Sequence, residues 1–153
     1  MDSLFFSEEH IMIQNMVREF AESEVAPIAQ ALDKNETFPS EIVTKMGELG
    51  MMGIVVPEEY GGAGLDMIAF VTAIIELGRV DASVAITMTA HTSLGTLPLL
   101  QLGNEEQKQA YLPQLASGKM LGAFGLTEPS AGSDAGATKT TAIRDGDSYI
   151  VNG

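Results

Sequence analysis

Apolar side chains recur at helical spacing from the beginning of the chain. The first stripe consists of Ile13, Met16, Val17, Phe20, Val25, Ile28 and Leu32. This i, i+3, i+4, i+7 pattern predicts an amphipathic helix with one buried face. Ser7 stands just before the stripe, and its hydroxyl can cap a helix N-terminus. Pro27 has no backbone donor and crowds the preceding turn, so we expect the helix to bend or split there.

Four more helices are predicted downstream. Their ranges are 39–50, 66–79, 82–94 and 104–118. Asp66 and Asp81 have side chains suited to N-caps, and Asn104 with Gln107 resembles a capping box. The first of these helices should bury Ile42, Val43, Met46 and Leu49. Residues 51–64 are rich in glycine and proline, which indicates an irregular connector.

The helix predicted over 82–94 is apolar or small on nearly every side, so we expect it to be buried and to end at Gly95. His91 lies on this helix and is predicted to be an interior imidazole whose hydrogen bonds are satisfied. His10 is expected to be exposed in the first turn of the first helix. Neither histidine has metal-ligand or catalytic-triad partners at a fixed spacing, so the sequence predicts no metal site.

The hydrophobic period changes after Gly118. Strands are predicted over 119–126, 138–143 and 148–151, with a turn at 144–147. The predicted fold class is therefore mainly α, with an amino-terminal orthogonal or up-down helical domain followed by the first strands of a β-barrel-like domain. The corresponding domain ranges are 1–118 and 119–153.

Composition narrows the possible partners. Eight Lys and Arg against 21 Asp and Glu give a net charge of −13, which argues against nucleic-acid binding. There is no cysteine, so disulfides and thiolate chemistry are excluded. No apolar run approaches the ~20 residues of a membrane helix, and no secretory or transit pattern opens the chain. We expect a cytoplasmic location, although a processed mitochondrial matrix protein would give the same pattern.

One segment concentrates groups that could bind a ligand. Residues 124–134 place Thr127, Ser130 and Ser133 directly after an apolar run, among small side chains. Small residues let a ligand approach the backbone, and successive N–H groups can form an anion-binding nest. Such a site suits a flat cofactor that carries a pyrophosphate. A hydrophilic β-turn without a ligand accounts for the same composition.

The segment 126–134 resembles the flavin-binding motif T-E-P-x-A-G-S-D of the acyl-CoA dehydrogenases. Two other stretches, 50–62 and 94–113, resemble further landmarks of that family. All three occur in the family's order and spacing. This agreement covers essentially the whole chain, and it is much more specific than any one of the motifs alone.

The resemblance implies an amino-terminal helical domain, a middle β domain and a carboxy-terminal helical domain that bind FAD. It also implies α,β-dehydrogenation of a short- or medium-chain acyl-CoA in fatty acid beta-oxidation, with electron-transfer flavoprotein as the acceptor and a homotetrameric assembly. The cofactor-binding residues that it indicates are Phe124, Leu126, Thr127, Gly132 and Ser133. Ser133 is also the predicted substrate contact, at the CoA end. The helix predicted over 82–94 would line the acyl pocket.

The family's catalytic base is a carboxylate of the carboxy-terminal domain, so no residue of this chain is assigned as catalytic. Glu128 lies inside the flavin motif, and we interpret it as structural. We therefore expect this chain alone to be inactive and to hold FAD weakly. Acyl-CoA oxidases and nitroalkane oxidases share the domain plan and remain alternatives. A non-enzymatic helical module that binds an acyl chain or a partner is the alternative from another class.

Overall fold

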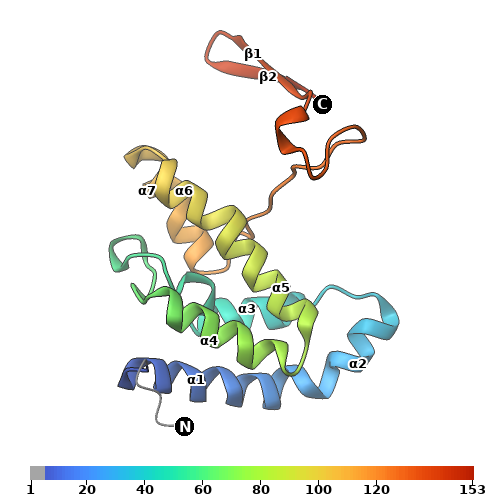
Figure 1. Ribbon diagram of the computed structural model, residues 1–153. Helices are drawn as coiled ribbons and strands as arrows, with labels where there is room; N and C mark the ends of the chain where they lie inside the picture. Colours follow the sequence, from blue (N-terminus) through green and yellow to red (C-terminus); the bar gives the residue numbers. More distant parts are fainter. Residues whose placement is uncertain (1–5) are drawn as a thin grey trace. The chain divides into compact units, whose positions relative to one another are not determined.

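Helices fill most of the chain and a β-hairpin follows them, in a computed structural model that describes residues 6–153 (Figure 1). The α-helices are α1 (Glu8–Phe20), α2 (Ala26–Asn35), α3 (Ser40–Glu48), α4 (Met67–Gly78), α5 (Ala82–Ala90), α6 (Leu97–Leu102) and α7 (Glu105–Ala116). Two π-helical segments, η1 (Ala21–Val25) and η4 (His91–Thr96), join consecutive helices. Three 3₁₀ turns are η2 (Met51–Gly53), η3 (Glu58–Tyr60) and η5 (Ala135–Ala137).

The strands β1 (Thr141–Asp145) and β2 (Ser148–Asn152) form an antiparallel two-stranded sheet. The predicted fold class, mainly α and followed by the first strands of a β region, is confirmed. The chain divides into two compact units between Ala123 and Phe124, called here the helical unit and the hairpin unit. The predicted domain boundary after residue 118 stays a prediction. None of the described helices is both long and apolar enough to cross a bilayer.

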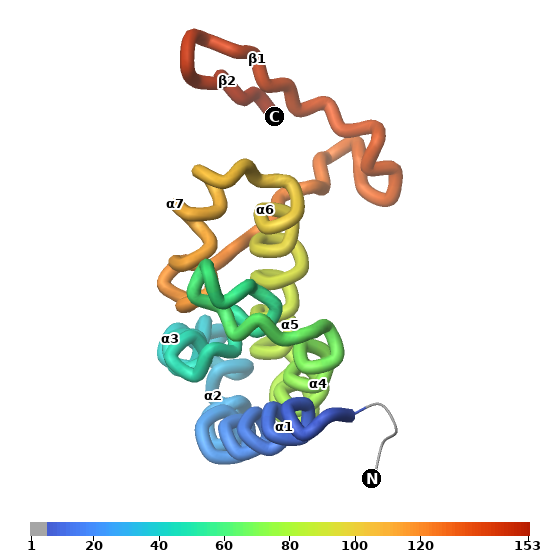
Figure 2. The backbone as a smooth tube through the Cα atoms, turned by 90° about the vertical axis from the view of Figure 1, so that its left-hand side faces the viewer, coloured from blue at the N-terminus to red at the C-terminus, as the bar shows by residue number. Residues whose placement is uncertain are grey.

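The core of the helical unit lies between α1 and α4, which run side by side, and the helices that cover them (Figures 1 and 2). The first apolar stripe contributes the buried Val17, Phe20 and Val25, as its spacing predicts. The apolar face of α3 contributes Ile42, Val43 and Met46. The prediction was wrong for Leu49 and Ile28, which are exposed.

The helix N-termini form where the sequence predicts them. Asp66 accepts the N–H groups of Ile68 and Ala69 at 3.0 and 2.9 Å, and Asp81 caps α5 in the same way. Asn104 and Gln107 form a reciprocal capping box. Each cap satisfies amide groups that have no partner inside the helix, so the side chain that starts the helix can be identified from local sequence.

The prediction that His10 is exposed was wrong, because this residue is only 8% exposed. Its Nδ1 accepts the Ser7 N–H at 3.0 Å, so the proton is on Nε2, which donates to Asp66 at 2.9 Å. The same carboxylate caps α4, and the Ala69 amide, followed by His10, lowers the pKa of Asp66. His10 therefore links the N-termini of α1 and α4, a contact between residues that are distant in sequence.

Each π-helical segment comes just before a proline. The residue that precedes the proline, Ala26 in one case and Leu97 in the other, donates its N–H to the carbonyl five residues earlier. Proline cannot donate, and its ring crowds the carbonyl four residues earlier. The wider π turn relieves this conflict without ending the helix. The first helix, which was predicted to bend or split at Pro27, thus continues from α1 through the π-helical segment η1 into α2, and Pro27 lies in the first turn of α2.

The prediction that the helix after Asp81 ends at Gly95 was wrong. The segments α5, η4 and α6 follow one another without a break and form a single column in Figure 2. Gly95 lies inside this column, and a Cβ at this position would stand 2.4 Å from the Cα of Gly122. The column is also not buried all round, since Ile86 and Leu94 are exposed. The glycine therefore marks a close backbone approach and not a helix end.

The prediction of a strand over 119–126 was also wrong. Residues 119 and 120 lie in a bend, and residues 121–126 have no regular secondary structure and pair with no strand among residues 6–153. The strand predicted over 138–143 begins only at Thr141, because the amides of Lys139 and Thr140 bond to the Glu128 carboxylate. The turn is shorter than predicted and consists of Gly146 and Asp147, with Gly146 at a φ of 60°.

Glu76 is the central polar group of the helical core. Its side chain is 3% exposed and accepts hydrogen bonds from Arg18 at 2.8 and 3.0 Å, from Arg79 at 2.7 Å and from Gln14 at 3.0 Å. Arg18, ahead of the other donors, outweighs burial and lowers the pKa of Glu76 to about 2. Gln14 and Arg18 belong to α1, whereas Glu76 and Arg79 belong to the C-terminal end of α4.

Replacing Glu76 by alanine should lower the free energy of unfolding of the helical unit by about 3 kcal/mol at pH 7. This is the low end of the cost of breaking a buried ion pair, because Arg18 and Arg79 can turn toward water. The measurement is urea unfolding followed by far-ultraviolet circular dichroism. Glu24→Ala, which removes an exposed partner of Lys45, is the matched control and should have a far smaller effect. Equal losses in both variants would contradict the role assigned to Glu76.

The contribution of Glu76 should also depend on pH. Its pKa of about 2 in the folded protein lies below the ordinary glutamate pKa of 4.5, so its stabilising effect is complete above the higher value. It is lost as the pH falls toward the lower one. The wild type should therefore lose stability in this range more steeply than Glu76→Gln, whose side chain does not titrate.

Candidate functional site

The residues indicated by the flavin motif lie at the beginning of the hairpin unit. Residues 124–127 belong to no helix or strand, and a tight turn follows in which Glu128 and Ala131 exchange backbone hydrogen bonds at 2.9 and 3.1 Å. Ala131 is buried, and its immediate neighbours in the turn are exposed. The turn is therefore anchored at its two ends, and it presents its middle residues to the surroundings.

A single carboxylate joins this turn to the hairpin. Glu128 accepts the N–H groups of Lys139 and Thr140 at 2.7 and 2.9 Å, and the Thr140 hydroxyl at 2.6 Å. The Thr140 hydroxyl, followed by the Lys139 amide, lowers the pKa of Glu128. All of these partners are within the hairpin unit, and they give Glu128 the structural role that the sequence indicates.

The turn and the hairpin enclose a shallow hollow of about 370 Å³. It is lined by Gly125, Leu126, Thr127, Glu128, Pro129, Thr138, Thr140 and Gly153. Two of the predicted cofactor residues, Leu126 and Thr127, are part of this lining. Phe124, Gly132 and Ser133 are not part of it. The sequence did not indicate Thr138 and Thr140, whose place depends on the long-range contact with Glu128.

The exposed groups of this segment fit a flavin nucleotide chemically. Phe124 and Leu126 are 56% and 44% exposed, and they offer apolar surface of the kind that a flat ring requires. Among the described residues, the hydroxyls of Thr127 and Ser133 have no hydrogen-bond partner, so they can donate to a ligand. A Cβ on Gly132 would meet nothing within 4 Å, so packing in this unit does not require glycine there.

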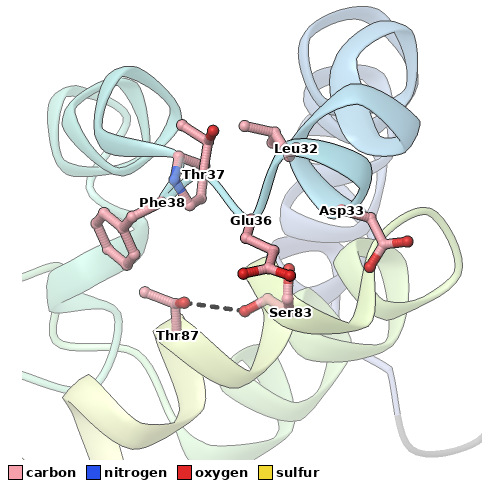
Figure 3. A pocket seen from close by; sticks show the side chains of 8 residues that line it. Leu32, Asp33, Glu36, Thr37, Phe38, Ser83 and Thr87 are labelled. Atoms are coloured by element: carbon pink, nitrogen blue, oxygen red, sulfur yellow. Dashed lines mark hydrogen bonds between the residues drawn. The ribbon is translucent and has the colours of Figure 1, made fainter.

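A second hollow, of about 400 Å³, lies in the helical unit between the end of α2 and α5 (Figure 3). Asp33, Glu36 and Phe38 line one side, and Ser83 and Thr87 line the other (Figure 3). The Thr87 hydroxyl is already bonded to the Ser83 carbonyl at 2.9 Å. Two carboxylates make this hollow unsuited to the phosphates of a nucleotide, and none of the predicted site residues lies there.

His91 is buried, as the sequence predicts, and is 1% exposed. Its Nε2 lies 3.2 Å from the Met52 carbonyl, and its Nδ1 accepts the Gly122 N–H at 3.0 Å. Burial lowers the pKa of His91, which favours the neutral ring. Both nitrogens are thus occupied by backbone groups, and nothing in this arrangement gives the ring a part in acid–base chemistry.

Comparison with known proteins decides the family. The model of the acyl-CoA dehydrogenase N-terminal domain matches residues 7–119. The chain belongs to the acyl-CoA dehydrogenase family. Among the relatives, the short-chain specific acyl-CoA dehydrogenase of Clostridium acetobutylicum is 50% identical over 147 residues, which are 96% of this chain. The match covers 39% of that relative, so the chain spans about two fifths of its length.

Solved structures of similar proteins agree with this assignment to the acyl-CoA dehydrogenases. A chain in a structure of the electron transferring flavoprotein of Acidaminococcus fermentans superposes with a TM-score of 0.96 at 48% identity, over 99% of this chain and 40% of that one. An acyl-CoA dehydrogenase from Bacillus anthracis, complexed with FAD, gives a TM-score of 0.90 at 43% identity. This match covers 97% of this chain and 26% of the Bacillus anthracis chain.

Replacing Glu128 by glutamine should loosen the turn, because Lys139 and Thr140 bond to different carboxylate oxygens, and the NH2 group of glutamine would stand against the N–H of one of them in either orientation. These two amides should exchange hydrogen several-fold faster in the variant. Deuterium exchange measured by mass spectrometry or NMR tests this. Asp147→Asn removes a carboxylate from the same unit and should leave both amides unchanged, and equal acceleration in the two variants would refute the assignment.

Proposed function

We propose that the protein containing this chain is an FAD-dependent acyl-CoA dehydrogenase that introduces an α,β double bond into a short-chain acyl-CoA thioester. The observation that carries the proposal is the exposed turn 127–133, held by Glu128, in a chain of this family. The proposed preference for short acyl chains rests on the Clostridium acetobutylicum relative, which is 50% identical and is named as short-chain specific. Medium-chain substrates are the second possibility.

In this proposal the residues of this chain bind and orient the cofactor and the substrate. The Thr127 hydroxyl and neighbouring N–H groups would donate to the polar edge of the flavin ring, a place where fixed donors favour the reduced, more negative cofactor. Ser133 would donate to the pyrophosphate or to the CoA end of the substrate, and Phe124, Leu126 and Gly132 would provide apolar and backbone contacts. The bound FAD would supply the oxidising chemistry.

The acyl chain would lie against the helical column that begins with α5. Its exposed apolar side chains include Ile86 and Leu94, which suit a hydrocarbon. No residue of this chain is proposed as the base that removes the α proton. Electron-transfer flavoprotein is the proposed acceptor, and the match to a chain in a structure of an electron transferring flavoprotein supports this choice. A homotetramer is the proposed assembly.

The decisive experiment is an anaerobic titration of the full-length protein with butyryl-CoA and octanoyl-CoA, following the visible absorbance of the flavin. Bleaching by butyryl-CoA at lower concentration supports a short-chain dehydrogenase, whereas preferential bleaching by octanoyl-CoA indicates the medium-chain class. A yellow protein that bleaches with neither substrate would refute the proposed reaction. A colourless protein that FAD cannot reconstitute would refute the cofactor as well.

Rapid reoxidation of the bleached protein by air would favour the acyl-CoA oxidase alternative, and bleaching by a nitroalkane would favour a nitroalkane oxidase. A helical module that only binds an acyl chain would be colourless. The same preparation therefore distinguishes all of these alternatives without further variants.

Replacing Thr127 by alanine in the full-length protein should weaken FAD binding by roughly five- to tenfold, the effect of losing about one hydrogen bond to the ligand. The measurement is the dissociation constant of FAD, from quenching of its fluorescence. Ser130→Ala removes a hydroxyl from the same turn that is not assigned to the flavin, and it should leave the constant unchanged. Equal effects of the two substitutions would count against the assignment of Thr127.

A further inference from the structure

The stretch between α7 and the flavin motif is held to the helical unit through His91. Gly122 donates its N–H to His91 Nδ1 at 3.0 Å, and Gly122 stands two residues before Phe124. This stretch belongs to no strand among residues 6–153, so it lacks the ladder of hydrogen bonds that would otherwise fix it. Met120 donates its N–H to the Gln114 carbonyl at 3.1 Å, and beyond Met120 it is the His91 side chain that holds the backbone of this stretch by a hydrogen bond.

The contacts of His91 allow one tautomer only. An amide N–H can bond to Nδ1 only through the nitrogen lone pair, so the proton of the neutral ring is on Nε2. That N–H faces the Met52 carbonyl at 3.2 Å. The nearby Thr96 hydroxyl donates to the His91 carbonyl at 3.0 Å, so it completes the π-helical turn that carries the ring. A second proton on the ring would stand against the Gly122 N–H.

The close packing of the backbone around Gly95 and Gly122 favours the same contact between His91 and the Gly122 amide. A Cβ on Gly122 would lie 2.8 Å from the Cα of Gly95 and 3.0 Å from the His91 carbonyl oxygen. The reciprocal Cβ on Gly95 would lie 2.4 Å from the Cα of Gly122. Two glycines on separate segments thus let the backbones approach closely enough for the imidazole to reach the amide. The π-helical segment that Pro98 imposes is the part of the column that makes this approach.

We propose that His91 is a positioning residue: as the neutral Nε2–H tautomer, it fixes the point at which the chain leaves the helical unit and enters the flavin-binding motif. The motif cannot bind FAD in a fixed geometry if the chain entering it is free to move. The part of the proposal that concerns FAD rests on the proposed function. The part that concerns the Gly122 amide does not.

The anchor should respond to pH in a defined direction. The groups that face the ring are the Met52 carbonyl from η2, the Thr96 hydroxyl from η4, the Gly122 amide and the backbone of Leu115 from α7. None of these groups is ionisable in this range. Burial lowers the pKa of His91, so the anchor is present at and above the ordinary histidine pKa and is lost when the pH falls through the lowered value.

Two substitutions distinguish the effect of losing the Nδ1 acceptor of His91 from the effect of changing the volume of its side chain. In His91→Asn, the amide oxygen can take the place of Nδ1 and accept the Gly122 N–H, although the side chain is smaller. In His91→Gln, the side chain has nearly the volume of histidine and can donate to the Met52 carbonyl from the place of Nε2, but the Nδ1 acceptor is gone. A role limited to filling space predicts that glutamine is the better replacement.

The readout is deuterium exchange of the Gly122 amide in the full-length protein, corrected for the intrinsic effect of pH. His91→Gln should accelerate this exchange about tenfold relative to His91→Asn. The amide of Leu65, which bonds to Ile54 in the same unit, is the internal control and should not change. Exchange at Gly122 should accelerate at low pH in the wild type and not in His91→Asn. Equal protection in both variants, or better protection with glutamine, would overturn the proposal.

A measurement on the wild type keeps the test independent of how the variants fold. Nitrogen NMR of the His91 ring should show an unprotonated Nδ1 and a protonated Nε2 at neutral pH, and the opposite tautomer would overturn the proposal. In the full-length protein, His91→Gln should bind FAD about tenfold more weakly than His91→Asn. Faster Gly122 exchange with unchanged FAD affinity would overturn the link to the cofactor. A wild type that binds no FAD would refute the proposed function and leave the amide result standing.

Discussion

The helical unit depends on one buried carboxylate. Glu76 lies near the C-terminal end of α4 and receives hydrogen bonds from Gln14 and Arg18 of α1. A carboxylate without partners could not be buried there, since its desolvation would cost several kcal/mol. The apolar faces of α1 and α4 could pack in several registers, but only one brings Glu76 between its donors. We infer that the ion pair selects the register and that the apolar core supplies most of the stability.

At the opposite end of the same two helices, a hydrogen bond between His10 and Asp66 also connects α1 to α4. Ser7 caps α1 and Asp66 caps α4, and the imidazole of His10 joins the two caps by bonding to both residues. The pair α1–α4 is therefore fixed near each end by a polar contact, with apolar side chains between. Such contacts determine the alignment of two helices more strictly than hydrophobic burial, which is non-directional.

The sequence was most informative where a structure is decided by neighbouring residues. The caps at Ser7, Asp66 and Asn104 were predicted because each depends on amides two or three residues away. The prediction errors arose where the local structure depends on residues that are distant in sequence. His10 bonds to Asp66, Gly95 lies against Gly122 from within its helix, and the residues before β1 bond to Glu128. For the site, the motif indicated Thr127 and Ser133, but no local pattern could indicate Thr138 and Thr140.

The acidic composition constrains how such a chain could bind an anionic cofactor. With eight basic residues against 21 acidic ones, the cofactor phosphates cannot rely on a basic surface. The turn after Thr127 offers backbone amides and hydroxyls, which attract an anion without a formal positive charge. Glu128 would repel that anion if it were free, but its carboxylate is bonded to Lys139 and Thr140. Because Glu128, the only acidic side chain of the segment 127–133, is bonded to the residues before β1, a glutamate at this position is compatible with the proposed binding of an anionic cofactor.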